Sequence, residues 1–310
     1  MNAVMYHYVR SQTRNMPHFR YLHIDNFKKQ LDYFQNVGHL ISREEFLEAV
    51  ATKKEIPDGF LLTFDDGFKD HIDYVLPELL SRNAVGLFFI PTAPYQSGRL
   101  LDVHRVHHLL GHFGGSEMLS FLLEHYKSGS LPFENIPEFH TETYSNQEND
   151  QATVQFKRVL NYFADPAQQT EILNILMGSL LSEDELFAGL YLTLGDLAEM
   201  HQAGMVIGSH SQNHRVLSKL SPQEQLTDLT NSLQFLDNIL DVIPVKTFCY
   251  PYGGFHSFNE FTEATLMRLG CQLAFNVEPR MISSKDFIER PSALPRYDCN
   301  MFPFGTASMG

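Results

Sequence analysis

The chain has 310 residues, a formal net charge of −14 and 43% hydrophobic residues, the composition of a soluble globular protein. This length can bury a full core, either as one large domain or as one domain with an insertion. The acidic balance argues against a nucleic-acid partner, and the sequence has no apolar run long enough for a membrane span.

The first residues and the cysteines indicate the cellular compartment in which we expect the protein. Residues 3–8 read as a strand that starts almost at Met1, so no signal peptide is visible and we expect a cytoplasmic protein. Cys249, Cys271 and Cys299 are odd in number and have apolar neighbours in the sequence, so we expect reduced thiols in the core.

The first third of the chain predicts strands that alternate with helices. Strands are expected at 3–8, 39–41, 60–64 and 83–92, helices at 24–36, 43–52 and 71–82, and a loop at 10–21. Asp25 is the expected N-cap of the first helix, and Ser42 with Glu45 forms a capping box for the second. Such alternation implies parallel strands.

The strand at 60–64 runs into Asp65, Asp66 and Gly67. Two neighbouring carboxylates at a strand end repel each other, and a metal ion offsets that cost if one ligates it while the other stays free as a base. Gly67 allows the sharp turn where the strand ends. For this tripeptide alone, an Asp-Asp-Gly surface turn is the alternative interpretation.

Residues 97–190 break this pattern and predict a helical insertion that packs as a lid or subdomain over the catalytic face. Helices are expected near 101–112, 116–127, 151–163 and 168–181, with a loop at 129–150. The first helix carries His104, His107, His108 and His112. His104 or His107 is a candidate to reach the site as an acid or substrate contact; a solvated amphipathic helix is the alternative.

A second polar strand end follows at 206–209, where the chain continues into His210 and His214. The spacing of four places both imidazoles on one face if the segment forms a helical turn. Two imidazoles and one carboxylate make a site for Zn²⁺ or another divalent ion with open positions for water and substrate. Because both pairs follow strands, they can point off the same end of a parallel sheet.

The remaining sequence continues the alternation. Helices are expected at 192–203, 221–240 and 258–269, strands at 245–250 and 272–276, and a short extended piece at 293–297. The strand at 245–250 ends in a third tip, Pro251-Tyr252-Gly253-Gly254.

Three motifs together resemble one family. Thr63-Phe64-Asp65-Asp66-Gly67, His210-Ser211-x-x-His214 and Tyr250-Pro251-Tyr252-Gly253 are similar to the NodB-like polysaccharide deacetylases, carbohydrate esterase family four. The resemblance covers roughly residues 1–92 and 191–300. It implies a single domain over 1–310, an α/β fold with a distorted (β/α) barrel of about seven parallel strands, and the insertion at 97–190. In such barrels the chemistry lies at the carboxyl ends of the strands.

The resemblance also assigns roles. Asp66, His210 and His214 would bind a divalent metal, most simply Zn²⁺, which lowers the pKa of a bound water. Asp65 would act as general base, and the backbone N–H of Tyr252 would help to hold the oxyanion.

The sequence departs from the family pattern in two places. The usual C-terminal Leu-x-His motif is missing and no histidine follows His256, so the general acid stays open among His104, His107 and His256. The usual arginine before Pro-Tyr-Gly is also missing, and Arg296 is expected to replace it, with an ordinary surface arginine as the alternative. His7, at the end of the first strand, is expected near the site or as a half-buried histidine without a role.

These expectations favour a metal-dependent N-deacetylase of an N-acetylated amino sugar. A cytoplasmic nucleotide-linked or lipid-linked glycan precursor is the expected substrate. The alternatives are hydrolysis of another non-peptide C–N bond, in a small cyclic amide or formamide, and a non-catalytic carbohydrate-binding relative. The sequence does not indicate the oligomeric state.

Overall fold

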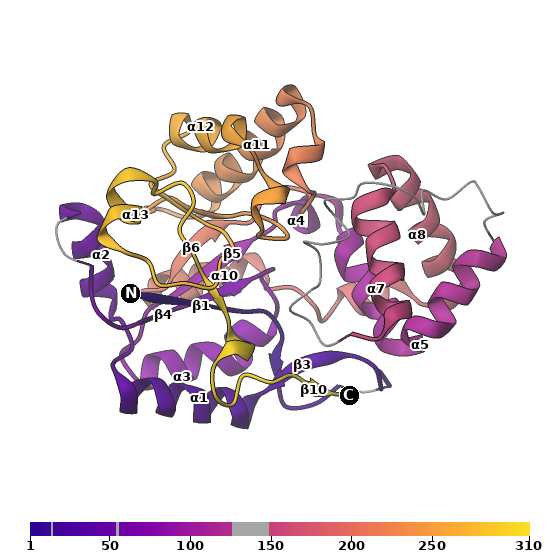
Figure 1. The fold of residues 1–310 in the computed structure, drawn as a ribbon, viewed down its shortest axis with the longest axis horizontal. Helices are drawn as coiled ribbons and strands as arrows, with labels where there is room; N and C mark the ends of the chain where they lie inside the picture. The colour runs from indigo at the N-terminus through magenta and orange to yellow at the C-terminus, as the bar shows by residue number, and fades with distance from the viewer. Residues whose placement is uncertain (14, 54–55, 126–148) are drawn as a thin grey trace. The chain divides into compact units, whose positions relative to one another are not determined.

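The computed structural model describes residues 1–13, 15–53, 56–125 and 149–310. Two compact units are present (Figure 1). The first comprises Met1–Ser11, Tyr21–Ser97 and Gly189–Ser308, and the second Gln12–Arg20, Gly98–Ala188 and Met309–Gly310.

The first unit is built on a seven-stranded sheet in the order β8-β7-β6-β5-β4-β1-β9. The strands are β1 (Asn2–Tyr6), β4 (Phe60–Asp65), β5 (Gly86–Ile90), β6 (Val206–Ser209), β7 (Thr247–Cys249), β8 (Leu273–Phe275) and β9 (Tyr297–Asp298). Every neighbouring pair runs parallel, as the alternation of strands and helices predicts. The predicted α/β half-barrel of about seven parallel strands is confirmed.

Side chains on successive strand residues point to opposite faces of the sheet, so alternate residues enter two different cores. In β5, Leu87 and Phe89 belong to one apolar cluster, while Phe88 and Ile90 belong to another. The second cluster includes Phe27 of the helix α1 (Ile24–Val37), whose ring centroid lies 6.1 Å from that of Phe64 on β4. Both faces of the strands are therefore buried, which explains their continuous apolar runs.

The other helices of this unit follow the strands along the chain. They are α2 (Arg43–Thr52), a π-helical turn (His71–Val75), α3 (Leu76–Ser81), α4 (Ala93–Ser97), α10 (Leu194–Gln202), α11 (Pro222–Ile239), α12 (Glu260–Arg268) and α13 (Ser284–Glu289). Short 3-10 turns occur at Leu217–Lys219, Phe255–Ser257 and Cys299–Met301. Helix α13 was not expected from the sequence.

Local predictions at the helix starts had mixed outcomes. The capping box of Ser42 and Glu45 is confirmed. The N-cap predicted at Asp25 is wrong, because the helix begins at Ile24 and His23 accepts the Asp25 N–H through Nδ1. The strand expected at 39–41 is reduced to a bridge between Leu40 and Phe60.

A small parallel pair lies outside the main sheet. Strand β2 (Val9–Arg10) pairs with β3 (Arg20–His23). The first and last residues of the segment 10–21, which was predicted to be a loop, therefore belong to strands. A last short strand, β10 (Ser308–Met309), ends the chain.

Within Gly98–Ala188, the largest segment of the second unit, the described residues are mostly helical. The unit contains α5 (Asp102–His125), α7 (Gln151–Arg158), a π-helical turn (Val159–Phe163), α8 (Pro166–Leu180) and α9 (Glu183–Phe187). Helix α5 is broken at Gly114, where φ is 78°. The buried guanidinium of Arg105 holds the unit together by donating to both carboxylate oxygens of Glu183 at 2.7 Å.

Two expectations about this region are not decided. Most of the loop predicted at 129–150 lies outside the described residues. The lid over the catalytic face stays a prediction. In the described part of the chain, no helix is long and apolar enough to cross a membrane.

The close packing of β6 generates a prediction. A Cβ added at Gly208 would lie 2.2 Å from Thr247 Oγ1 and 2.8 Å from the Thr247 carbonyl oxygen. We expect Gly208→Ala to destabilise the protein by about 1–3 kcal/mol through overpacking, measured by thermal unfolding. Gly178→Ala on α8 is the control, because nothing lies within 4 Å of its added Cβ. It should be neutral or stabilising, and equal losses in both variants would contradict the packing argument.

Candidate active site

Three polar tips follow the carboxyl ends of strands β4, β6 and β7. Asp65 ends β4, and the chain then turns at Asp66 and Gly67, whose φ angles are 78° and 64°. Ser211, His214 and Tyr252 also have positive φ, at 66°, 51° and 64°. Left-handed backbone at residues other than glycine costs energy and persists only where the surroundings enforce it, so these tips are held in defined conformations.

The structure brings Asp66, His210 and His214 together, the three residues predicted as metal ligands. Asp66 Oδ1 lies 3.6 Å from His210 Nε2 and 3.4 Å from His214 Nε2. All three side chains are buried, and their ligand atoms lie close enough to hold a metal ion. One carboxylate and two imidazoles suit zinc and other divalent transition metals.

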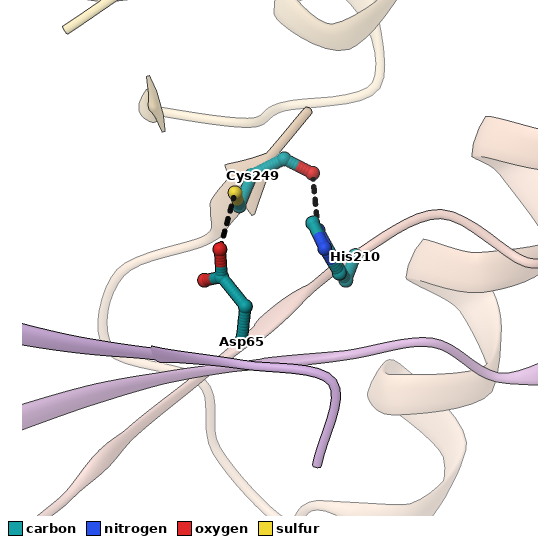
Figure 2. A group of neighbouring side chains, drawn as sticks. All are labelled: Asp65, His210 and Cys249. Atoms are coloured by element: carbon teal, nitrogen blue, oxygen red, sulfur yellow. Dashed lines mark hydrogen bonds between the residues drawn. The ribbon is translucent and has the colours of Figure 1, made fainter. Parts of the chain in front are cut away.

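The orientation of His210 fits this interpretation. Its Nδ1 donates to the Cys249 carbonyl at 2.8 Å, as Figure 2 shows. This leaves the lone pair on Nε2, the nitrogen that lies 3.6 Å from Asp66 Oδ1. Burial lowers the pKa of His210 and so favours the neutral imidazole that binds metals. A ring nitrogen that donates to a backbone carbonyl is the usual device for orienting a histidine ligand.

The helical turn expected for His210 and His214 is wrong. The segment is a loop with left-handed residues at Ser211 and His214, not a helix. The two imidazoles converge because the loop folds back on itself, with the His214 N–H donating to Ser211 Oγ at 2.9 Å.

A buried ion pair fixes the second carboxylate, Asp65. Arg296 donates from Nη1 to Oδ1 at 2.8 Å and from Nη2 to Oδ2 at 2.9 Å, a bidentate fork. Burial alone would raise the pKa of Asp65, but Arg296 and then His210 lower it to about 2. Arg296 is 1% exposed, so it is not the surface arginine of the alternative interpretation. It takes the orienting place expected for it.

Cys249 contacts both Asp65 and His210. Its thiol donates to Asp65 Oδ2 at 3.5 Å, as Figure 2 shows, and accepts from Arg296 Nη2 at 2.8 Å. Burial raises the pKa of this thiol, which keeps it neutral. Asp65, His210 and Cys249 form a second group of possible metal ligands, but the fork from Arg296 already occupies Asp65. From the sequence, Cys249 was expected only as a core residue; its place at the last position of a strand was the available signal.

Among the histidines, His7 lies beside the base. It follows β1, and its Nε2 is 3.9 Å from Asp65 Oδ2 with 36% of the side chain exposed. The ring of Tyr252 lies 5.0 Å from that of His214.

The predicted acid candidates are placed elsewhere in the chain. His256 lies in the 3-10 turn after the Tyr252 tip, and its carbonyl accepts from Ser218 Oγ at 2.6 Å. His104 and His107 lie on α5 of the second unit with ring centroids 5.9 Å apart, and their role in the site stays a prediction.

The three cysteines are free thiols, with Cys249 and Cys271 buried and Cys299 only partly buried. The first two therefore lie in the core as expected.

Comparison with known proteins finds similarity to one family over part of the chain. The sequence profile of the polysaccharide deacetylases matches residues 189–274. A putative polysaccharide deacetylase of Bacillus subtilis strain 168, YxkH, is 32% identical over 89 residues, which are 29% of this chain and 30% of the relative. The chain therefore matches less than a third of that relative's length.

Solved structures are similar along nearly the whole chain. The deacetylase PplD of Streptococcus pyogenes, in complex with acetate, is 19% identical with a TM-score of 0.59, covering 98% of this chain and 95% of PplD. A de-N-acetylase from Aggregatibacter actinomycetemcomitans is 13% identical with a TM-score of 0.56, covering 96% and 93%. The BpsB deacetylase domain of Bordetella bronchiseptica is 15% identical with a TM-score of 0.54, covering 96% and 94%. At these identities the likeness shows the fold.

The half-barrel of parallel strands, which carries paired carboxylates and histidines at its carboxyl edge, is a fold that this chain shares with these solved deacetylases. The predicted resemblance to the NodB-like polysaccharide deacetylases is confirmed, since the profile covers the His210 and Tyr252 motifs and the solved relatives share the fold.

The ion pair of Arg296 and Asp65 generates a pH prediction for the metal-free protein. In the parent, the folded pKa of Asp65 is about 2, below the ordinary 3.8. The ionised Asp65 paired with Arg296 therefore contributes its full stabilisation above pH about 4, and this stabilisation is lost as the pH falls towards about 2. In Arg296→Met the carboxyl stays buried without its cation, so its pKa rises above the unfolded value. We expect a loss of about 3–5 kcal/mol near pH 7 that shrinks towards pH 4, measured by urea unfolding.

Arg280→Met is the matched control. Arg280 is 42% exposed and forms an ion pair with Asp286 at 2.7 Å, so its loss should cost less than about 1 kcal/mol. A loss in Arg296→Met that is the same at pH 4 and pH 7 would contradict the assignment to Asp65.

Proposed function

We propose that this chain is a metal-dependent N-deacetylase of amino sugars. One observation carries the proposal: Asp65, held ionised by Arg296, stands directly before Asp66, which lies within 3.6 Å of both His210 and His214. A base and a set of metal ligands at one strand end are the two parts that amide hydrolysis by water needs.

The donor set fits a divalent cation, with Zn²⁺ as the first choice. Asp66, His210 and His214 supply one carboxylate oxygen and two imidazole nitrogens, and fewer than four protein ligands leave positions open. A bound cation would polarise the acetamide carbonyl and lower the pKa of a water molecule.

Asp65 takes the proton of the attacking water. A carboxylate with a pKa of about 2 is a weak base, so it acts only on a water that the site has made acidic. The fork from Arg296 and the thiol of Cys249 fix which oxygen faces the water. The fixed position of the Asp65 carboxylate thus compensates for its low basicity.

The oxyanion that forms on the acetyl group requires a donor. We assign the backbone N–H of Tyr252 to this task because the left-handed turn at φ 64° lies next to the His214 ring. A donor fixed in advance is commonly worth several kcal/mol in such reactions.

The leaving amine requires a proton, and we assign its delivery to His7. Its Nε2 lies 3.9 Å from Asp65 Oδ2, and the partly exposed ring can contact a substrate. An imidazole is the side chain best suited to proton transfer near neutral pH. His104, His107 and His256 remain the alternatives predicted from the sequence.

The class of substrate is part of the proposal. A cytoplasmic nucleotide-linked or lipid-linked precursor of a glycan remains our candidate, supported by the sequence alone. The description of the solved relatives as deacetylases supports the reaction class.

The first prediction is acetate release. Purified protein supplied with Zn²⁺ should release acetate from one class in a panel of nucleotide-linked N-acetyl sugars, free monosaccharides and chito-oligomers, and a chelator should stop it. Asp65→Asn should lower kcat by at least about 10²-fold while zinc binding persists. Asp58→Asn, an exposed aspartate before β4, is the control and should keep the parent's rate. No release by zinc-loaded, folded protein would favour a different amide substrate or a carbohydrate-binding role.

A second prediction identifies the proton donor. His7→Gln should lower kcat by about 10²–10⁴-fold, leave zinc affinity unchanged and flatten one limb of the pH profile. The same change at His104, His107 and His256 provides the comparison, measured on the substrate found above. If His104→Gln or His107→Gln gives the large loss and His7→Gln does not, the assignment of His7 is wrong.

A further inference from the structure

The loop that carries two metal ligands lacks support from regular structure. Residues 210–216 form neither helix nor strand between β6 and the 3-10 turn Leu217–Lys219. Two of its residues, Ser211 and His214, adopt left-handed backbone, which is unfavourable for side-chain-bearing residues. Other groups must therefore hold this loop.

One buried side chain on a neighbouring helix does so. Asp228 of α11 accepts the Gln212 N–H through Oδ1 at 2.8 Å. It also accepts the backbone N–H and the side-chain amide of Asn213 through Oδ2, each at 3.1 Å. The side chain of Asp228 is buried at 4% exposure and contacts the residues that separate the two histidines. Burying a carboxylate is costly unless donors satisfy it, and here the loop supplies three.

The same face of α11 makes a second connection one turn further on. Ser232 and Ser209 are joined by their hydroxyls at 2.9 Å, and Ser209 Oγ accepts the Ser211 N–H at 3.2 Å. The His210 N–H donates to the Ile90 carbonyl at 3.0 Å, which fixes the other side of the loop to β5. Helix α11 and strand β5 thus hold the loop from both sides.

We propose that Asp228 is a positioning residue of the metal site: it locks the 210–214 loop so that His210 and His214 face Asp66 before any metal binds. The hydrogen bonds of Asp228 to the loop go to Gln212 and Asn213, and through these residues Asp228 acts on the two histidines. The inference rests on the metal set proposed above. Without this carboxylate, binding a metal must also order the loop, and that cost lowers the affinity.

The test measures metal affinity directly. Asp228→Asn keeps the shape of the side chain but turns an N–H donor towards the loop N–H groups. Zinc affinity is measured by competition with a chromophoric chelator, and bound Co²⁺ reports the coordination geometry by its absorption. We expect a 10–100-fold weaker affinity and an altered cobalt spectrum.

Two control variants on the same helix separate positioning from general stability. Asp237→Asn makes the same chemical change at a residue whose partner is Lys246, at 2.6 Å on the surface. Leu236→Ala removes core packing without touching a hydrogen bond of the loop. Both should bind zinc within about twofold of the parent, although Leu236→Ala should unfold at a lower temperature.

The outcomes are distinct. If the parent binds zinc and Asp228→Asn binds it equally well, the positioning role is wrong while the proposed function stands. If the parent binds no metal, the metal set itself is wrong and both fail. Should Asp228→Asn not fold, Asn213→Ala removes one of the three contacts and should weaken zinc binding severalfold; unchanged affinity there overturns the inference.

Discussion

The active site depends on one buried ion pair, between Asp65 and Arg296. Two adjacent carboxylates at a strand end would repel each other in a site of low polarity, and the guanidinium offsets this for the one that is not aimed at the histidines. The partners are 231 residues apart in the chain. Arg296 directly precedes the two-residue strand β9, which pairs with β1, so the pairing of this strand places the guanidinium at Asp65.

Strain and hydrogen bonding are arranged together around this pair. Left-handed residues occur at the tips that carry Asp66, His214 and Tyr252, and the hydrogen bonds that hold them reach into neighbouring strands and helices. Cys249 serves two tips at once, because its carbonyl orients His210 while its thiol contacts Asp65. The site is therefore a property of the sheet edge as a whole, and its geometry is fixed before a ligand binds.

The candidate ligands could be predicted from the sequence because they lie within a few residues of the end of an apolar strand and match short family motifs. Asp66, His210 and His214 were identified in this way, although the helical turn invoked for the histidines is a loop. Local signals such as the Ser42 capping box were also sufficient, because both partners lie within one turn. Asp25 was misjudged because the residue before the helix, His23, supplied the cap.

The sequence by itself determined the parallel strands, the polar residues at their carboxyl ends and the family resemblance, since apolar runs and short motifs are local properties. Only the tertiary structure decided which distant groups meet there. It brought Arg296 and Cys249 into hydrogen bonds with Asp65 and placed His7 close to the same carboxylate. It also brought Asp228 into a hydrogen bond with the loop that carries His210 and His214. The reason is physical: strand order and helix packing bring these groups together, and periodicity within a segment carries no record of which segments become neighbours.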